Sequence, residues 1–83
     1  MSATISTGRV VKVAGPVVDV EFPPDALPEI YFAIEFDIAI PGSKKETVVA
    51  EVAQHLGDNR VRAIAMKPTD GLVRGAPARN TGA

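Results

Sequence analysis

Residues 7–22 read Thr-Gly-Arg-Val-Val-Lys-Val-Ala-Gly-Pro-Val-Val-Asp-Val-Glu-Phe, and their pattern indicates the fold class. Two short runs with a β-strand pattern, residues 9–14 and 17–22, flank Gly15 and Pro16. A regular strand ladder cannot continue through this pair, because proline lacks an amide donor and glycine adds backbone freedom. The sequence therefore predicts two strands with a bend between them.

Side chains alternate in character along both runs, as they do in a strand with two different faces. In the second run one face carries Val18, Val20 and Phe22, and the other carries Val17, Asp19 and Glu21. In the first run the same rule puts Val10 and Lys12 on one face and Val11 and Val13 on the other. The pattern predicts half-buried antiparallel strands, with both carboxylates on the solvent side.

The chain has 83 residues, which is enough for one small domain that buries about 60 to 65% of its unfolded surface. Valine and isoleucine far outnumber leucine, and this bias favours strands over long helices. Seven glycines and seven prolines supply many breaks, as several short strands joined by tight loops require. We therefore expect an all-β domain.

Charge and cysteine content exclude several functional classes. Nine Lys and Arg against ten Asp and Glu give a net charge of −1, so no long-range field favours nucleic acid or an acidic membrane. The chain has no cysteine, which excludes disulfides and thiolate metal sites. Apolar stretches are short and the start of the chain lacks the regions of a signal peptide, so we expect a soluble, unexported domain without membrane insertion.

The rest of the chain continues the β pattern after a proline-rich rigid loop at residues 23–28. Four further strands are predicted, at residues 30–40, 46–54, 60–66 and, least regularly, 76–83. Residues 1–7 are expected to be a flexible start and residues 8–83 the folded domain. Five or six short strands of this kind predict a small closed or nearly closed barrel, which leaves few exposed sheet edges.

Buried faces follow from the alternation in two of these strands. The first carries its apolar face at Ile30, Phe32, Ile34, Phe36, Ile38 and Ile40, and the second at Val48, Ala50 and Val52. In residues 60–66 both faces contain apolar side chains, so either could point inward. Residues 68–75 are rich in glycine and could hold a single helical turn capped by Thr69 or Asp70.

Motifs that would carry chemistry are missing. No Gly-x-x-x-x-Gly-Lys-Ser/Thr phosphate loop occurs, and Lys44 is read as a solvated turn residue. His55 is the single histidine and is expected to make a local hydrogen bond or to face solvent. Asp19 and Glu21 could form a catalytic carboxylate pair in principle, but the sequence gives no reason for their burial. We therefore predict no catalytic, metal or cofactor site in this chain.

A nucleic-acid-binding barrel is the alternative from another class, because small barrels often bind single strands through a basic groove and stacking aromatics. Alternation places Phe32 and Phe36 in the core, which leaves Tyr31 to stack. Arg60, Arg62 and Lys67 form a modest basic cluster. A free-standing interaction barrel and a small metabolite-binding enzyme also stay open on these residues alone.

Several short motifs are spread along nearly the whole chain. They include Gly8-Arg9-Val10-Val11, Gly15-Pro16-Val17-Val18-Asp19-Val20, Leu27-Pro28-Glu29-Ile30-Tyr31 and residues 61–66. The runs Ala-Gln-His-Leu-Gly at 53–57 and Asp-Gly-Leu-Val-Arg-Gly at 70–75 are the most specific. Together these motifs resemble one family, the β subunit of F-type ATP synthase. Pro77-Ala78-Arg79-Asn80 departs from the family pattern of two apolar residues and an aspartate, which bears on the sixth strand.

The resemblance implies a six-stranded Greek-key barrel, the non-catalytic N-terminal crown domain of that subunit. It also implies α-subunit barrels as partners, an alternating hexamer, and a peripheral place on the cytoplasmic face of the cell membrane. Family residues that bind ATP, ADP and Mg²⁺ lie in later domains, so no cofactor is expected here. Outward charged residues are the candidate contacts with α barrels: Glu35, Asp37, Glu51 and Arg62.

Overall fold

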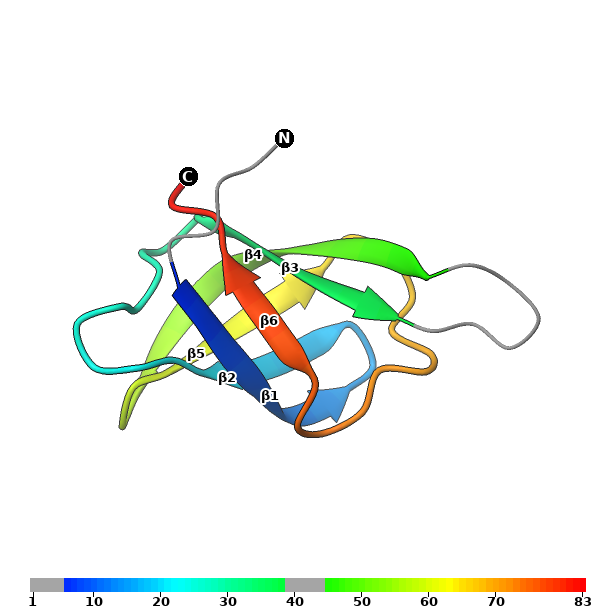
Figure 1. Ribbon diagram of the computed structural model, residues 1–83, viewed down its shortest axis with the longest axis horizontal. Coiled ribbons are helices and arrows are strands. Elements are labelled where there is room, and N and C mark those ends of the chain that lie inside the picture. Colours follow the sequence, from blue (N-terminus) through cyan, green and yellow to red (C-terminus); the bar gives the residue numbers. More distant parts are fainter. Residues whose placement is uncertain (1–5, 39–44) are drawn as a thin grey trace.

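The computed structural model describes residues 6–38 and 45–83, and all regular elements within them are β-strands. Six strands follow one another: β1 (Ser6–Ala14), β2 (Val17–Glu21), β3 (Ala33–Ile38), β4 (Glu46–Gly57), β5 (Arg60–Ala65) and β6 (Pro77–Asn80). They pair antiparallel in the order β1-β2-β5-β4-β3-β6, and β6 lies between β1 and β3 (Figure 1). The predicted all-β fold and the closed six-stranded barrel are confirmed.

The strand order is that of a Greek key. Strands β3, β4 and β5 are consecutive neighbours, and β6 returns to pair with β3 on the opposite side from β4. The returning strand begins with Pro77, a position at which a strand tolerates the missing amide donor. The unusual residues of this segment therefore still form the sixth strand and close the barrel.

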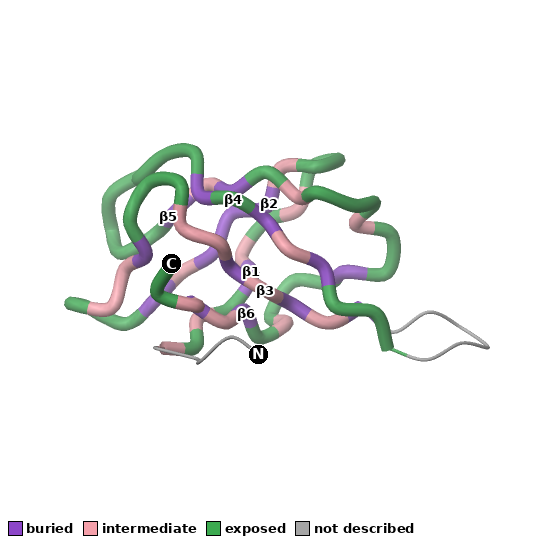
Figure 2. Tube along the Cα trace, turned by 90° about the horizontal axis from the view of Figure 1, so that it is seen from above, coloured by how far each residue is buried: buried purple, intermediate pink, exposed green. Residues whose placement is uncertain are grey.

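Buried residues alternate with less buried ones along β3, β5 and β6, and Figure 2 shows buried positions spaced along the chain trace in this way. In β2 the three central residues are all buried. The fully buried members of the core come from every strand, and include Val10, Val18, Val20, Ile34, Phe36, Val48, Val52, Val61, Ala63 and Ala78. The sequence left open which face of β5 points inward. The structure shows that Val61 and Ala63 are buried in the core, while Ile64 is exposed. The predicted inward faces of β2, β3 and β4 are confirmed for the residues that lie within these strands.

A β-bulge changes the faces of β1 from those that simple alternation predicts. The register shifts between Val10 and Lys12, so that Val10 pairs with Val20 and Lys12 with Asp19. One extra residue on a strand reverses the faces beyond it. Val10 is therefore buried and Lys12 exposed, although the sequence placed them on one face.

The predicted strand at residues 30–40 begins later than expected. β3 starts at Ala33, Tyr31 has a φ of 73°, and Ile30 is exposed rather than buried. The Tyr31 amide donates to the Val52 carbonyl while the Val52 amide donates to the Phe32 carbonyl, which anchors this bend against β4. Ile40 and Lys44 lie outside the described residues.

Other details of the strand boundaries and loops also differ from the sequence prediction. β1 begins at Ser6, two residues before the expected start of the domain, because Ser6 and Thr7 pair with β6. β4 continues to Gly57, because its last residues pair with β5. No helical turn forms in residues 68–75, where Gly71 and Gly75 each have a φ of 90° and interrupt helical geometry.

Candidate functional site

Two predicted contact residues, Glu35 and Asp37, form a polar cluster with Arg79 across the β3–β6 seam. Arg79 Nη1 and Nη2 donate to the two carboxylate oxygens of Asp37, each at 3.1 Å. Thr47 Oγ1 donates to Asp37 Oδ1 at 2.9 Å, and Arg79 Nε lies 3.7 Å from Glu35 Oε1. We call Glu35, Asp37, Thr47 and Arg79 the Arg79 cluster.

Hydrogen bonding within the Arg79 cluster sets its protonation states. The bonds from Arg79, and then the bond from Thr47, lower the pKa of Asp37 below its ordinary value. The bonds to Asp37 in turn raise the pKa of Arg79. Both groups are therefore held charged, and the cluster is a satisfied ion pair with no character of a general acid or base.

Arg62, the third predicted contact residue, is engaged with Asp19 on the neighbouring strand β2. Its Nε and Nη2 donate to the two Asp19 carboxylate oxygens at 2.9 and 3.1 Å. The pKa of Arg62 is raised, first by this hydrogen bonding and then by the charge of Asp19. Asp19 points outward as predicted, but the expectation of a solvent-exposed carboxylate is wrong, because Arg62 helps to cover it and leaves it 6% exposed.

Glu51, the fourth predicted contact residue, lies on an outward surface of different character. It pairs in register with Ile64 across β4 and β5, and no ion pair to Glu51 exists among the described residues. Ile64 and Met66 beside it are 40% and 61% exposed. We call Glu51, Ile64 and Met66 the β4–β5 patch, an exposed apolar surface with one free carboxylate.

His55 makes a structural hydrogen bond. Its Nε2 lies 2.8 Å from the Pro28 carbonyl oxygen and donates to it in the tautomer that carries the proton there. The expected hydrogen bond is thus present, but it joins β4 to the loop before β3 rather than to a local partner. In the described part of the chain, no group of His, Asp and Glu side chains is arranged to hold a metal ion.

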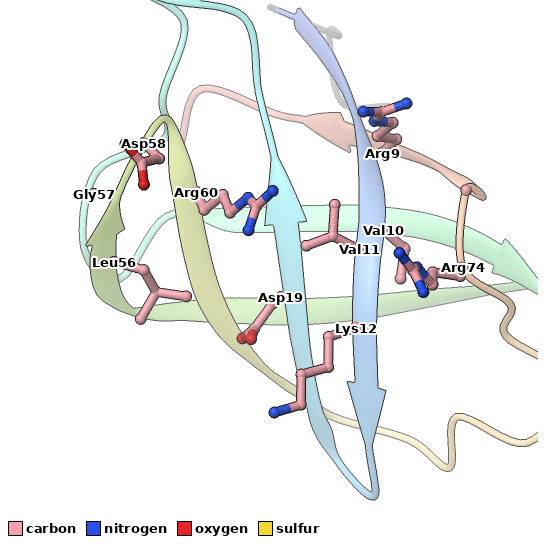
Figure 3. A pocket seen from close by; sticks show the side chains of 11 residues that line it. Arg9, Val10, Val11, Lys12, Asp19, Leu56, Gly57, Asp58, Arg60 and Arg74 are labelled. Atoms are coloured by element: carbon pink, nitrogen blue, oxygen red, sulfur yellow. The ribbon is translucent and has the colours of Figure 1, made fainter.

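A pocket of about 550 Å³ lies on the outside of the barrel between β1, β2 and the β4–β5 turn (Figure 3). Four basic side chains line it: Arg9, Lys12, Arg60 and Arg74. In Figure 3 Arg60 and Lys12 extend over β2, and the Asp19 carboxylate lies between them. We call this pocket the basic groove.

Comparison with protein families agrees with this architecture. Residues 10–82 match the model of the beta-barrel domain of the ATP synthase alpha/beta family. The chain belongs to the ATP synthase alpha/beta family. The match covers nearly the whole chain and is shared by the alpha and beta branches, so it establishes the barrel domain of the family without separating the two branches.

Sequence reasoning found the charged residues of this family domain but not their connections. Arg79 was noticed as a departure from the family pattern, and the structure pairs it with two predicted contact residues. The basic groove was not predicted, because Lys12 reaches it through the bulge in β1 and Arg74 through an irregular loop. The described residues contain no helix that is long and apolar enough to cross a membrane.

Proposed function

We propose that this barrel is the N-terminal crown domain of an F-type ATP synthase β subunit. In this role it holds the alternating α/β hexamer together and takes no part in the chemistry of ATP synthesis. The family match over residues 10–82, on a closed six-stranded barrel, is the observation that carries the proposal. ATP, ADP and Mg²⁺ then bind in a later domain of the subunit, and this domain binds none of them.

Two sequence runs favour the β branch over the α branch. Residues 53–57 read Ala-Gln-His-Leu-Gly and residues 70–75 read Asp-Gly-Leu-Val-Arg-Gly, both of which resemble the β subunit. The histidine of the first run also has a structural role, because His55 in β4 hydrogen-bonds to the Pro28 carbonyl and so holds the loop before β3 in place. The partners in the proposal are α-subunit barrels, and the place of action is the cytoplasmic face of the membrane, as part of a peripheral complex.

Packing is the mechanism of such a domain, and the β4–β5 patch is the surface best suited to it. Ile64 and Met66 expose apolar area, whose burial contributes roughly 25 cal/mol per Å². Glu51 is free to pair with a partner's cation, whereas Asp37 and Arg62 already have internal partners. We therefore place the α-barrel contact at this patch, with Glu51 as its charged member.

The nucleic-acid alternative lacks a stacking platform on the described surface. Phe22 and Phe36 are buried, Phe32 is partly buried, and Tyr31 is the exposed aromatic residue of the described chain. None of these four aromatic residues is among the residues that line the basic groove. A single-stranded ligand would therefore meet charge without stacking.

The proposal is tested by sedimentation velocity of the chain mixed with purified α subunit. We expect the chain to sediment with the α subunit, and Ile64→Glu to abolish this because a charge enters an apolar contact. Val73→Glu is the matched control, since Val73 is also exposed but lies outside the β4–β5 patch. Circular dichroism checks that both variants keep the barrel.

Three results would contradict the assembly role. The chain could fail to sediment with the α subunit, it could bind oligo(dT) in a salt-sensitive manner, or ATP could raise its melting temperature. The second result would favour a nucleic-acid module and the third a nucleotide-binding protein.

A further inference from the structure

The basic groove concentrates positive charge on one side of a chain whose net charge is −1. Its four basic residues come from three separate parts of the chain: Arg9 and Lys12 from β1, Arg60 from β5, and Arg74 from the loop before β6. The barrel topology, rather than a local run of sequence, brings them together. This convergence makes the groove a candidate for binding an anionic ligand.

Two of the four cations are not neutralised within the protein. Arg9 and Arg60 share one carboxylate, Glu21, at 3.1 and 3.5 Å. Within residues 6–38 and 45–83, no carboxylate oxygen lies within 4 Å of Lys12 Nζ or of the Arg74 guanidinium. Lys12 and Arg74 are both exposed, so their charges are available to a partner.

The carboxylates of the groove do not cancel this excess. Asp19 lies directly opposite Lys12 in the strand register, but both of its oxygens accept hydrogen bonds from Arg62. Asp58 stands at the rim, in the turn between β4 and β5. Because Asp19 is already neutralised by Arg62, it repels an incoming anion far less than a free carboxylate would.

Apolar side chains in the same groove indicate what kind of anion fits. Val11 and Leu56 line it together with the cations, and Leu56 is exposed. A compact phosphate would leave these side chains in contact with water, and a nucleic acid strand would find no aromatic residue for stacking. An acidic polypeptide with apolar side chains between its carboxylates can pair with the cations of the groove and also contact its apolar side chains.

We propose that the basic groove docks an extended acidic peptide segment, with Lys12 and Arg74 pairing its carboxylates and Val11 and Leu56 contacting its apolar side chains. The inference goes beyond the crown role, because the groove and the β4–β5 patch share no residue. A negative result for the groove would therefore not affect the proposed crown role, and a negative result for the crown role would not affect the groove.

The test uses a synthetic peptide of alternating glutamate and leucine, titrated into the ¹⁵N-labelled chain and followed by amide chemical shifts. We expect saturable shifts at Val11, Lys12, Leu56 and Arg74, and weaker binding at higher salt. The double variant Lys12→Gln/Arg74→Gln should weaken binding about tenfold, because two exposed ion pairs are lost. A peptide with lysine in place of glutamate should produce no shifts at these residues.

Lys45→Gln/Lys67→Gln is the matched control, because it removes the same charge at residues that do not line the groove. Its affinity should stay within about twofold of that of the unchanged chain. Equal weakening by both double variants would overturn the proposal, and so would shifts located elsewhere on the unchanged chain. Tighter binding of tripolyphosphate or of oligo(dT) at the same residues would also overturn it, in favour of a phosphate or a nucleic acid site.

Discussion

Asp19 and Arg62 illustrate how the surface of this barrel is determined at the level of single residues. Asp19 lies on the outward face of β2, where exposure is the usual outcome, but the planar guanidinium of Arg62 spans both its oxygens. A bidentate arginine–carboxylate pair fixes the relative orientation of the two groups more tightly than a lysine does, because lysine presents a single point charge. We conclude that the pair fixes the relative positions of β2 and β5 on their outer side.

The first prediction concerns the strength of this pair. Asp19→Asn should lower the free energy of unfolding by about 1 to 2 kcal/mol, because a nearly buried charge-assisted contact is lost. Arg62→Lys should also lower the stability, since lysine keeps the charge but not the bidentate geometry. Urea unfolding of both single variants and of the double variant measures the coupling. Simple additivity of the two losses would show that the residues act independently.

Gly8 is a second residue whose identity the packing requires. A Cβ atom at this position would lie 2.8 Å from Phe22 Cδ1 and would also collide with the Glu21 carbonyl oxygen. One of these atoms belongs to the backbone of β2, so a rotamer change cannot relieve the overlap.

We therefore predict that Gly8→Ala destabilises the barrel by about 1 to 3 kcal/mol. Thermal unfolding of this variant is compared with that of Ala14→Val, which adds volume at an exposed position of the same strand. Ala14→Val should change stability by no more than about 0.5 kcal/mol. Equal stability of the two variants would mean that β2 moves freely away from Gly8.

At the level of elements, the β3–β6 seam depends strongly on side chains. Its ladder pairs Ile34 with Asn80 and Glu35 with Arg79, which is fewer register pairs than any other described pair of strands has. Thr81 Oγ1 extends the seam by donating to the Ala33 carbonyl at 2.8 Å. The Arg79 cluster adds two hydrogen bonds to Asp37, so this seam should weaken when Asp37 is protonated.

The sign of that pH dependence follows from the lowered pKa of Asp37. A carboxyl group with a lower pKa in the folded state stabilises the fold above its ordinary value of 3.8, and this contribution is lost as the pH falls through the folded-state pKa. Asp37→Asn should cost about 1 kcal/mol at neutral pH and progressively less in acid. Unfolding free energies measured across the acid range test this convergence.

Asp58→Asn is the control for the same series, because Asp58 lies in the exposed β4–β5 turn. We expect the unfolding free energy of this variant to equal that of the unchanged chain across the same pH range. If the difference in unfolding free energy between Asp37→Asn and the unchanged chain stays constant as the pH falls, this would contradict an ionic role for Asp37 at the seam.

Which elements the sequence could predict depended on how regular their alternation was. The buried faces could be predicted at Val18 and Val20 in β2, and at Phe36 in β3 and Val48 in β4. There the pairing of β2 with β5 and of β3 with β4 is regular, so simple alternation holds. The bulge beside Val11 and the positive φ of Tyr31 have no comparable signal, since both arise from pairing with distant strands. Arg79 could be placed only once the register of β6 against β3 was known.

For the molecule as a whole, closure of the barrel turns scattered charges into separate surfaces. The β4–β5 patch exposes apolar side chains, the Arg79 cluster is satisfied internally, and the basic groove keeps two cations unpaired. The fold class and the family could be predicted from local patterns, because alternation and motifs are written in consecutive residues. The three surfaces could not be, because each combines side chains from different strands whose register is not set by consecutive residues.

Immunoprecipitation of the native protein from its source cells, with an antibody against this barrel, distinguishes a crown domain from a free-standing barrel. For a crown domain we expect a polypeptide well above 8.7 kDa, recovered from the membrane fraction together with ATP synthase α subunits. A soluble polypeptide near 8.7 kDa recovered without α subunits would contradict the crown role and would leave a free-standing barrel.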